Sequence, residues 1–245
     1  MTPRLVTIPF SHYCEKARWS LERCGVPFVE DPHMPLLHWL PALRAGGGRT
    51  VPILVADDAR VIADSTDIAA WADARSGGAL RRGPAALALE DDFDRQLGPA
   101  TRRWGYQQLL PRADILELMR GSVPGWELAV FRMTRPVATG LLRRGLRVTP
   151  AGVARSLAKI DAVFARVGAL LADGRRFLTG PELSIADVTF AALASPALRP
   201  AEVPFGMPAD LVLSPAATAQ VAAWRATPAG RFALALYAHQ RARSA

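Results

Sequence analysis

The strand signals of this chain end near residue 78, and this change of pattern constrains its fold more than any other feature. Before it, short apolar runs alternate with helical periodicity, in the order strand, helix, strand, loop or short helix, hairpin and helix. Strand–helix alternation followed by a hairpin is typical of a small mixed α/β sheet. We predict strands over 5–8, 27–30, 53–55 and 60–63 and helices over 11–23 and 65–74.

The stretch 76–84 combines glycine, proline and arginine, which is the composition of an interdomain linker. Beyond it, apolar residues recur almost only at helical spacing. The sequence therefore predicts an α/β domain at 1–78, a linker at 79–84 and an all-helical domain at 85–245. The helices expected there cover 85–110, with an interruption near Gly98-Pro99, then 153–171, 184–194 and 217–225.

Composition excludes several classes of protein. Apolar residues make up 50% of the 245, which is enough for a large core and too many for a disordered chain. No run approaches the ~20 apolar residues that a membrane helix needs, and no secretory signal is evident. The two cysteines, Cys14 and Cys24, are too few for a disulfide framework or a four-cysteine zinc site. We expect a cytoplasmic protein with no membrane span and no metal.

The chain is basic, with a net charge of +8. Lys16 and Lys159 are the only lysines among 30 basic residues, so arginine supplies nearly all of this charge. The densest arginine run, 132–147, is interspersed with apolar residues, as on an amphipathic helix with one buried face. No zinc-finger, RNA-binding or helix-turn-helix motif accompanies it. We therefore expect no nucleic-acid partner, and interpret the run as a solvated or ligand-facing basic stripe.

Ser11 stands at the turn from the first strand into the first helix. A serine in this position commonly caps the helix. It also lies beside free backbone N–H groups and the positive end of the helix, which together stabilise an anion. Cys14 follows one helical turn later, where a small thiol is usually buried.

Two further motifs flank strands of the first domain. Val51-Pro52 directly precedes a strand, and a cis bond there would turn the Val51 backbone outward to pair with an extended peptide ligand. Asp64-Ser65 opens the helix after the hairpin. Its residues either cap that helix or hold a ligand through the Ser65 N–H and hydroxyl.

Ser184 and Asp187 form a capping box in the helical domain, with Leu183 and Val188 placed to form a hydrophobic staple. We assign this motif to folding rather than to chemistry.

In their order and spacing, the four motifs resemble the cytosolic glutathione transferase family, of the serine/cysteine type, with Arg18 placed seven residues after Ser11. The resemblance implies a thioredoxin-like domain followed by a C-terminal helical bundle. It also implies glutathione as cosubstrate, an acceptor pocket between the domains and a homodimer.

The resemblance gives roles to particular residues. Ser11 would be the catalytic group, donating a hydrogen bond to the glutathione thiolate. It matches the exposed first position of a C-x-x-C motif, and Cys14 matches the buried fourth. Tyr13 is the nearest rival donor. The Val51 backbone, in front of cis Pro52, would pair with the cysteinyl part of glutathione.

The two ends of glutathione need further partners. Asp64 and Ser65 would hold the γ-glutamyl end. The glycyl carboxylate would meet one of His38, Arg44 or Arg49, and the sequence does not choose among them.

The chain departs from the family pattern at 34–49 and at 112–149, which is longer than expected. Aromatic residues of the second domain are candidates either for the acceptor pocket or for core packing: Trp104, Tyr106, Trp126 and Phe131.

The implied function is a glutathione transferase that attacks an electrophilic, largely apolar small molecule. Isomerisation, dehalogenation and ether cleavage occur on the same fold, and the acceptor-binding loops decide among them. Two alternatives remain: a glutathione-dependent thiol–disulfide oxidoreductase that uses Cys14, and a noncatalytic ligand-binding protein.

Overall fold

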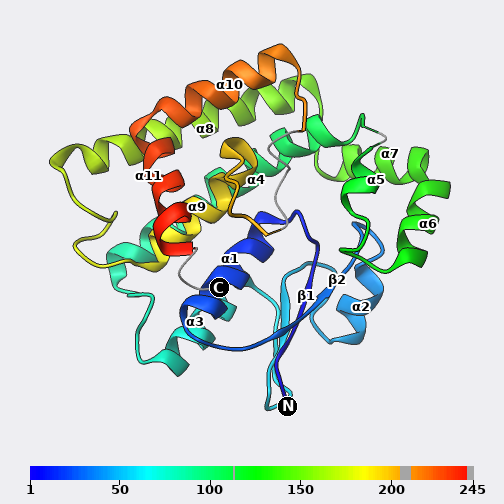
Figure 1. Cartoon of the computed structure of the whole chain (residues 1–245), viewed down its shortest axis with the longest axis horizontal. Helices are drawn as coiled ribbons and strands as arrows, with labels where there is room; N and C mark the ends of the chain where they lie inside the picture. The colour runs from blue at the N-terminus through cyan, green and yellow to red at the C-terminus, as the bar shows by residue number, and fades with distance from the viewer. Residues whose placement is uncertain (113, 205–210, 242–245) are drawn as a thin grey trace.

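The computed structural model describes residues 1–112, 114–204 and 211–241. The first domain, which contains the labelled strands β1 and β2 in Figure 1, is thioredoxin-like. Its four-stranded mixed sheet has the order β2-β1-β3-β4. Strands β1 and β2 are parallel, whereas β3 is antiparallel to both β1 and β4. Its elements are β1 (Arg4–Thr7), α1 (His12–Arg23), β2 (Val29–Pro32), α2 (Trp39–Arg44), β3 (Ile53–Val55), β4 (Val61–Ile62) and α3 (Ser65–Ser76).

Alternation along the central strands divides the sheet into two buried faces. Leu5 of β1 lies opposite Leu54 of β3, and both pack with apolar residues of α1 and α3. The next pair, Val6 and Ile53, points to the other face and packs with Ala42 of α2. Helices α1 and α3 therefore cover one face of the sheet, and α2 covers the other.

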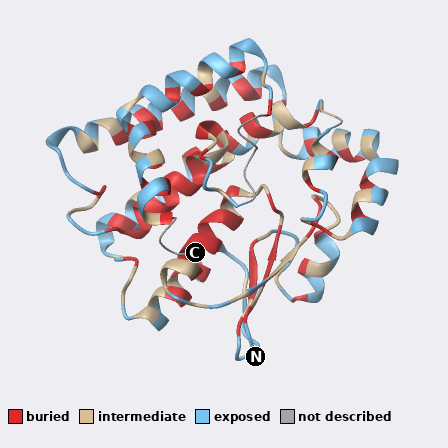
Figure 2. Ribbon diagram, viewed as in Figure 1, coloured by how far each residue is buried: buried red, intermediate tan, exposed pale blue. Residues whose placement is uncertain are grey.

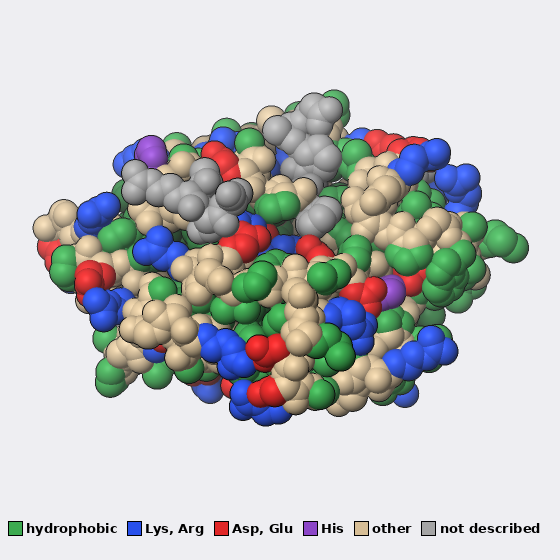
Figure 3. All heavy atoms as spheres, turned by 60° about the horizontal axis from the view of Figure 1, so that its bottom comes forward, with side chains coloured by type: hydrophobic (Ala, Val, Ile, Leu, Met, Phe, Trp, Pro, Cys, Tyr) green, Lys and Arg blue, Asp and Glu red, His purple; other side chains and the backbone are tan. Residues whose placement is uncertain are grey.

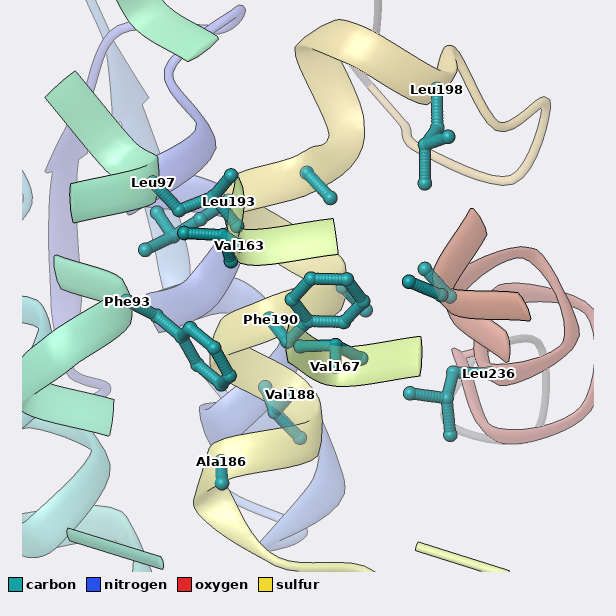
Figure 4. Close-up of a cluster of buried hydrophobic side chains, with 14 of the residues drawn as sticks. Phe93, Leu97, Val163, Val167, Ala186, Val188, Phe190, Leu193, Leu198 and Leu236 are labelled. Carbon is teal, nitrogen blue, oxygen red and sulfur yellow. The ribbon is translucent and has the colours of Figure 1, made fainter. Parts of the chain in front are cut away.

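The second domain is helical, and α9 is its central helix (Figure 2). Its Phe190 faces Phe93 of α4, with the ring centroids 5.3 Å apart (Figure 4). The ring centroid of Phe164 of α8 lies 5.6 Å from that of Phe190. The helices are α4 (Pro84–Leu109), α5 (Ile115–Leu118), α6 (Gly125–Met133), α7 (Arg135–Gly145), α8 (Pro150–Leu170), α9 (Ile185–Leu198), α10 (Pro215–Ala226) and α11 (Pro228–Leu236); a 3₁₀ turn (Leu171–Asp173) follows α8, and a π-helical turn (Tyr237–Arg241) follows α11.

Buried charges attach α1 to its neighbours. Lys16 donates to Thr66 of α3 at 2.9 Å and to Asp94 of α4 at 2.7 Å. Arg18 donates to Glu30 of β2 at 2.6 and 2.8 Å. Because each of these cations is buried with a carboxylate partner, α1 is held in a fixed position relative to both domains.

The capping box forms as the sequence predicts. Asp187 accepts from the Ser184 N–H at 2.8 Å and also from the N–H of Leu178 at 2.8 Å. Leu183 and Val188 are buried in the same core cluster. The motif thus closes the start of α9 and fixes the preceding loop.

Several expected boundaries are wrong. Helix α4 continues through Gly98-Pro99 without the expected interruption, and α9 likewise contains Pro196. Buried residues before and after Pro99 pack into the main core, and this packing outweighs the hydrogen bond that proline removes. Strand β2 begins two residues later than expected. Helix α11 was not predicted from the sequence.

The segment 112–149 contains α5, α6 and α7 and builds a second, smaller apolar core with Met34. No described helix is long and apolar enough to cross a membrane.

Candidate functional site

A cleft of about 440 Å³ lies between the two domains. The loop before α1, the segment 34–39 and residues 49–51 form one wall. The opposite wall comes from α4, from the segment containing α5–α7 and from the end of α9. The buried apolar residues that line the cleft include Met34, Leu110, Leu116, Met119, Phe131 and Leu142.

Ser11 lines this cleft and is the N-cap of α1. Its hydroxyl accepts weakly from the Cys14 N–H, at 3.4 Å, and its own N–H donates to the Ile8 carbonyl at 3.0 Å. The first-turn N–H groups of a helix lack intrahelical acceptors, and the helix dipole is positive there. The half-buried hydroxyl therefore stands at a position that favours a bound anion.

Cys14 is fully buried and does not line the cleft. Burial raises the pKa of its thiol. The thiol is thus protonated and shielded from solvent, a setting opposite to that of a reactive cysteine.

Tyr13 and His12 hold α1 against α4. The Tyr13 hydroxyl donates to the Asp94 carbonyl at 3.1 Å, and burial raises the pKa of this phenol to about 12. His12 is buried with its Nε2 2.9 Å from the Gly98 carbonyl, so the ring donates there. Burial lowers its pKa to about 3, and the imidazole stays neutral. Both side chains line the cleft, but their polar atoms serve the domain contact.

The Val51-Pro52 peptide bond is cis, as the family resemblance implies. Val51 lines the cleft just before β3, whose pairing with β1 starts at Ile53. Pro52 is buried beneath it and does not reach the cleft. The Val51 backbone is therefore placed at the cleft wall rather than inside the sheet.

The basic candidates of 34–49 differ in their surroundings. The His38 Nε2 lies 3.0 Å from the Arg49 carbonyl, and burial lowers the pKa of the ring. His38 therefore holds the backbone that leads to Val51. The Arg49 side chain is exposed, lines the cleft and lies 5.6 Å from the ring centre of Trp39. Arg44 does not line the cleft.

Asp64 and Ser65 begin α3 and do not line the cleft. Asp64 is exposed, and its carboxylate accepts from the Thr66 N–H at 2.7 Å. Ser65 is buried. The structure thus brings Ser11, Tyr13, His38, Arg49 and Val51 to one cleft and leaves these two at the neighbouring helix start.

The aromatic candidates separate into three environments. Tyr106 and Phe131 line the cleft. Trp104 is instead part of the main core, with its ring centre 5.2 Å from that of Trp224. Trp126 is 60% exposed and lies outside the cleft, so neither tryptophan is an acceptor-pocket residue.

Arg102 is a cleft residue that the sequence interpretation missed. It forms no ion pair with a described residue, and its guanidinium lies 5.8 Å from the ring centre of Tyr13. Arg102, Tyr106 and Leu109 all line the cleft and are spaced four and three residues apart along α4, so helical spacing from Tyr106 could have indicated Arg102. Metal binding has no support among the described residues, which contain no cluster of three ligating side chains.

A thioredoxin-like domain and a helical domain with a cleft between them define the class of this protein. The glutathione S-transferase N-terminal domain model matches residues 5–80, and the glutathione S-transferase C-terminal domain model matches residues 150–227. The chain therefore belongs to the glutathione S-transferase family.

Solved structures of similar fold cover nearly the whole chain. The β-etherase LigF from Sphingobium sp. strain SYK-6 is 20% identical with a TM-score of 0.61, over 96% of this chain and 99% of that one. A glutathione S-transferase from Rhodospirillum rubrum F11 is 20% identical with a TM-score of 0.57, over 98% and 99%. FzlA from C. crescentus is 19% identical with a TM-score of 0.55, over 96% and 92%. No curated protein matched the sequence.

Proposed function

We propose that this protein is a cytoplasmic, homodimeric glutathione transferase whose Ser11 activates the thiol of glutathione. The observation that carries the proposal is the position of Ser11, at the start of α1 and in the lining of a largely apolar cleft. The Ser11 hydroxyl donates a hydrogen bond to the thiolate sulfur, and the helix start stabilises the negative charge. Together they lower the pKa of the bound thiol.

Glutathione lies along the first domain in this proposal. Its cysteinyl part pairs with the Val51 backbone, and its γ-glutamyl end meets Asp64 and Ser65 at the start of α3. The glycyl carboxylate meets Arg49, whose exposed guanidinium reaches the cleft. His38 supports this arrangement indirectly by holding the Arg49 carbonyl.

The acceptor occupies the apolar part of the cleft, against Tyr106 and Phe131. The thiolate attacks an electrophilic carbon, a carbon–sulfur bond forms, and the leaving group departs with the bonding electrons. Ether cleavage is one version of this step, and the similarity to LigF, described as a β-etherase, makes ethers acceptors to assay beside aryl halides.

The burial and raised pKa of Cys14 argue against the oxidoreductase alternative. A matched pair of variants tests this choice. Ser11→Ala removes a hydrogen bond to a charged group, worth about 1.5–3 kcal/mol. The pKa of the bound thiol should then rise by about 1–2 units, and turnover at neutral pH should fall at least about tenfold. Cys14→Ala should leave both close to the parent.

Thiolate absorbance of the glutathione complex and conjugation of a generic aryl halide are the two measurements. If Cys14→Ala abolishes reduction of a mixed glutathione disulfide while Ser11→Ala has no effect, the active group is Cys14. Retention on a glutathione column without turnover of any electrophile would favour the noncatalytic alternative.

A further inference from the structure

Helices α6 and α7 present a row of apolar side chains to solvent. Met133 is 84% exposed and Val137 is 66% exposed. Trp126 and Val130 precede them and Leu141 follows, at spacings of three or four residues. We call these five residues the α6–α7 patch.

The α6–α7 patch is separate from the side of these helices that forms the core. Phe131 of α6 and Ala138 and Leu142 of α7 already face the smaller apolar core that 112–149 builds with Met34. The two helices therefore bury one apolar side and expose another. Contiguous exposed apolar surface on a folded protein usually marks a contact with a partner or a membrane.

Arginines predominate around the patch, where the exposed carboxylate of Glu117 on α5 pairs with Arg132. Residues 125–147 contain five arginines and a single carboxylate, Glu127. Glu127 is fully buried and bonded to His33, so it neutralises no charge at the surface. Arg143, Arg144 and Arg147 are exposed and form no ion pair with a described residue. Figure 3 shows hydrophobic side chains projecting at the right edge of the molecule, with Lys and Arg side chains flanking them.

The exposed apolar side chains and the surrounding arginines together favour one kind of partner. A second copy of the chain in a twofold contact would bring unpaired arginines against each other. A polynucleotide would engage the arginines but not Met133 and Val137. An anionic bilayer accounts for both the apolar side chains and the arginines, because apolar side chains enter the headgroup boundary while arginines bind phosphate oxygens.

We propose that the α6–α7 patch docks this protein on the surface of an anionic membrane. The interaction is peripheral, since no described helix can span a bilayer. Leu141 belongs both to the patch and to the cleft lining. Docking therefore places one edge of the cleft at the bilayer, where apolar molecules are concentrated. That consequence rests on the proposed function, whereas the docking itself does not.

Cosedimentation with vesicles tests the proposal at physiological salt. The chain should bind vesicles of phosphatidylcholine with about a third phosphatidylglycerol, and bind pure phosphatidylcholine at least about tenfold more weakly. Arg143→Glu/Arg144→Glu should reduce binding to the anionic vesicles by a similar factor. Lys159→Glu/Arg176→Glu makes the same charge change at exposed sites outside the patch and should have little effect.

Met133→Ser/Val137→Ser tests the apolar contribution without altering charge or the cleft lining. This variant should bind anionic vesicles several-fold more weakly, and circular dichroism should show it folded. Failure of the parent to bind anionic vesicles would overturn the proposal. Equal binding by the parent and both patch variants would also overturn it. So would a change from dimer to monomer in a patch variant, measured by light scattering, because the patch would then be an interface between copies of the chain.

Discussion

Glu127 of α6 accepts a hydrogen bond from His33, which directly follows β2, and the two side chains are 2.6 Å apart. The other carboxylate oxygen accepts from the Met34 N–H at 2.7 Å. Burial alone disfavours the charged imidazole, but the hydrogen bond and charge of Glu127, together with Asp31, raise its pKa above the usual range. This buried pair ties the segment 112–149 to the thioredoxin-like domain and holds one wall of the cleft in place.

Glu127→Gln should therefore destabilise the protein. The amide keeps the shape of the carboxylate, but it removes the charge and turns one acceptor into a donor facing another donor. Removing one partner of a buried pair costs about 3–5 kcal/mol. Glu117→Gln is the matched control at an exposed position of α5, where Glu117 pairs with Arg120 and Arg132 and each exposed ion pair is worth at most about 1 kcal/mol. Urea unfolding measures both, and equal effects would contradict the assigned role of Glu127.

Because of His12, the free energy of unfolding should decrease as the pH falls. The folded pKa of His12 is about 3, below the usual 6.5, so the stabilisation is complete above pH 6.5. It is lost as the pH falls toward 3, because the unfolded chain takes up the proton first. Between pH 7.5 and 5.0 this amounts to about 2 kcal/mol. His12→Gln keeps a neutral N–H donor but cannot be protonated, so its stability should fall less over that range. Parallel pH dependences for parent and variant would count against this account.

Gly98→Ala should destabilise the contact between α1 and α4. A Cβ at this position would lie 2.6 Å from Cζ of Tyr13, well inside normal contact. Overpacking of this kind costs about 1–3 kcal/mol. Gly140→Ala in α7 has open space and should instead gain up to about 1 kcal/mol of helix stability. Thermal unfolding compares the two variants, and stabilisation by both would show that Tyr13 moves aside freely.

Ser184→Ala should lower stability without changing the chemistry. The capping box lies outside the cleft, and losing an N-cap costs about 0.5–2 kcal/mol. The melting temperature should fall, while turnover per folded molecule stays near that of the parent. A variant as stable as the parent but with lost turnover would place the motif in the active site.

The sequence alone determined the features that depend on neighbouring residues. Helical spacing and turn residues predicted the mixed sheet, the change to helices after residue 78 and the cap at Ser11. The pair Ser184 and Asp187 formed the expected box, because both partners lie within one helical turn.

The tertiary structure decided everything that depends on distant contacts. Two tryptophans of similar local setting became a core residue, Trp104, and a surface residue, Trp126. Helix α4 continued through Pro99 because core packing on both sides outweighed the missing hydrogen bond. Arg102 reached the cleft, and Glu127 became a buried partner of His33 from 94 residues away. Burial and charge pairing are set by residues remote in sequence, so no local pattern could specify them.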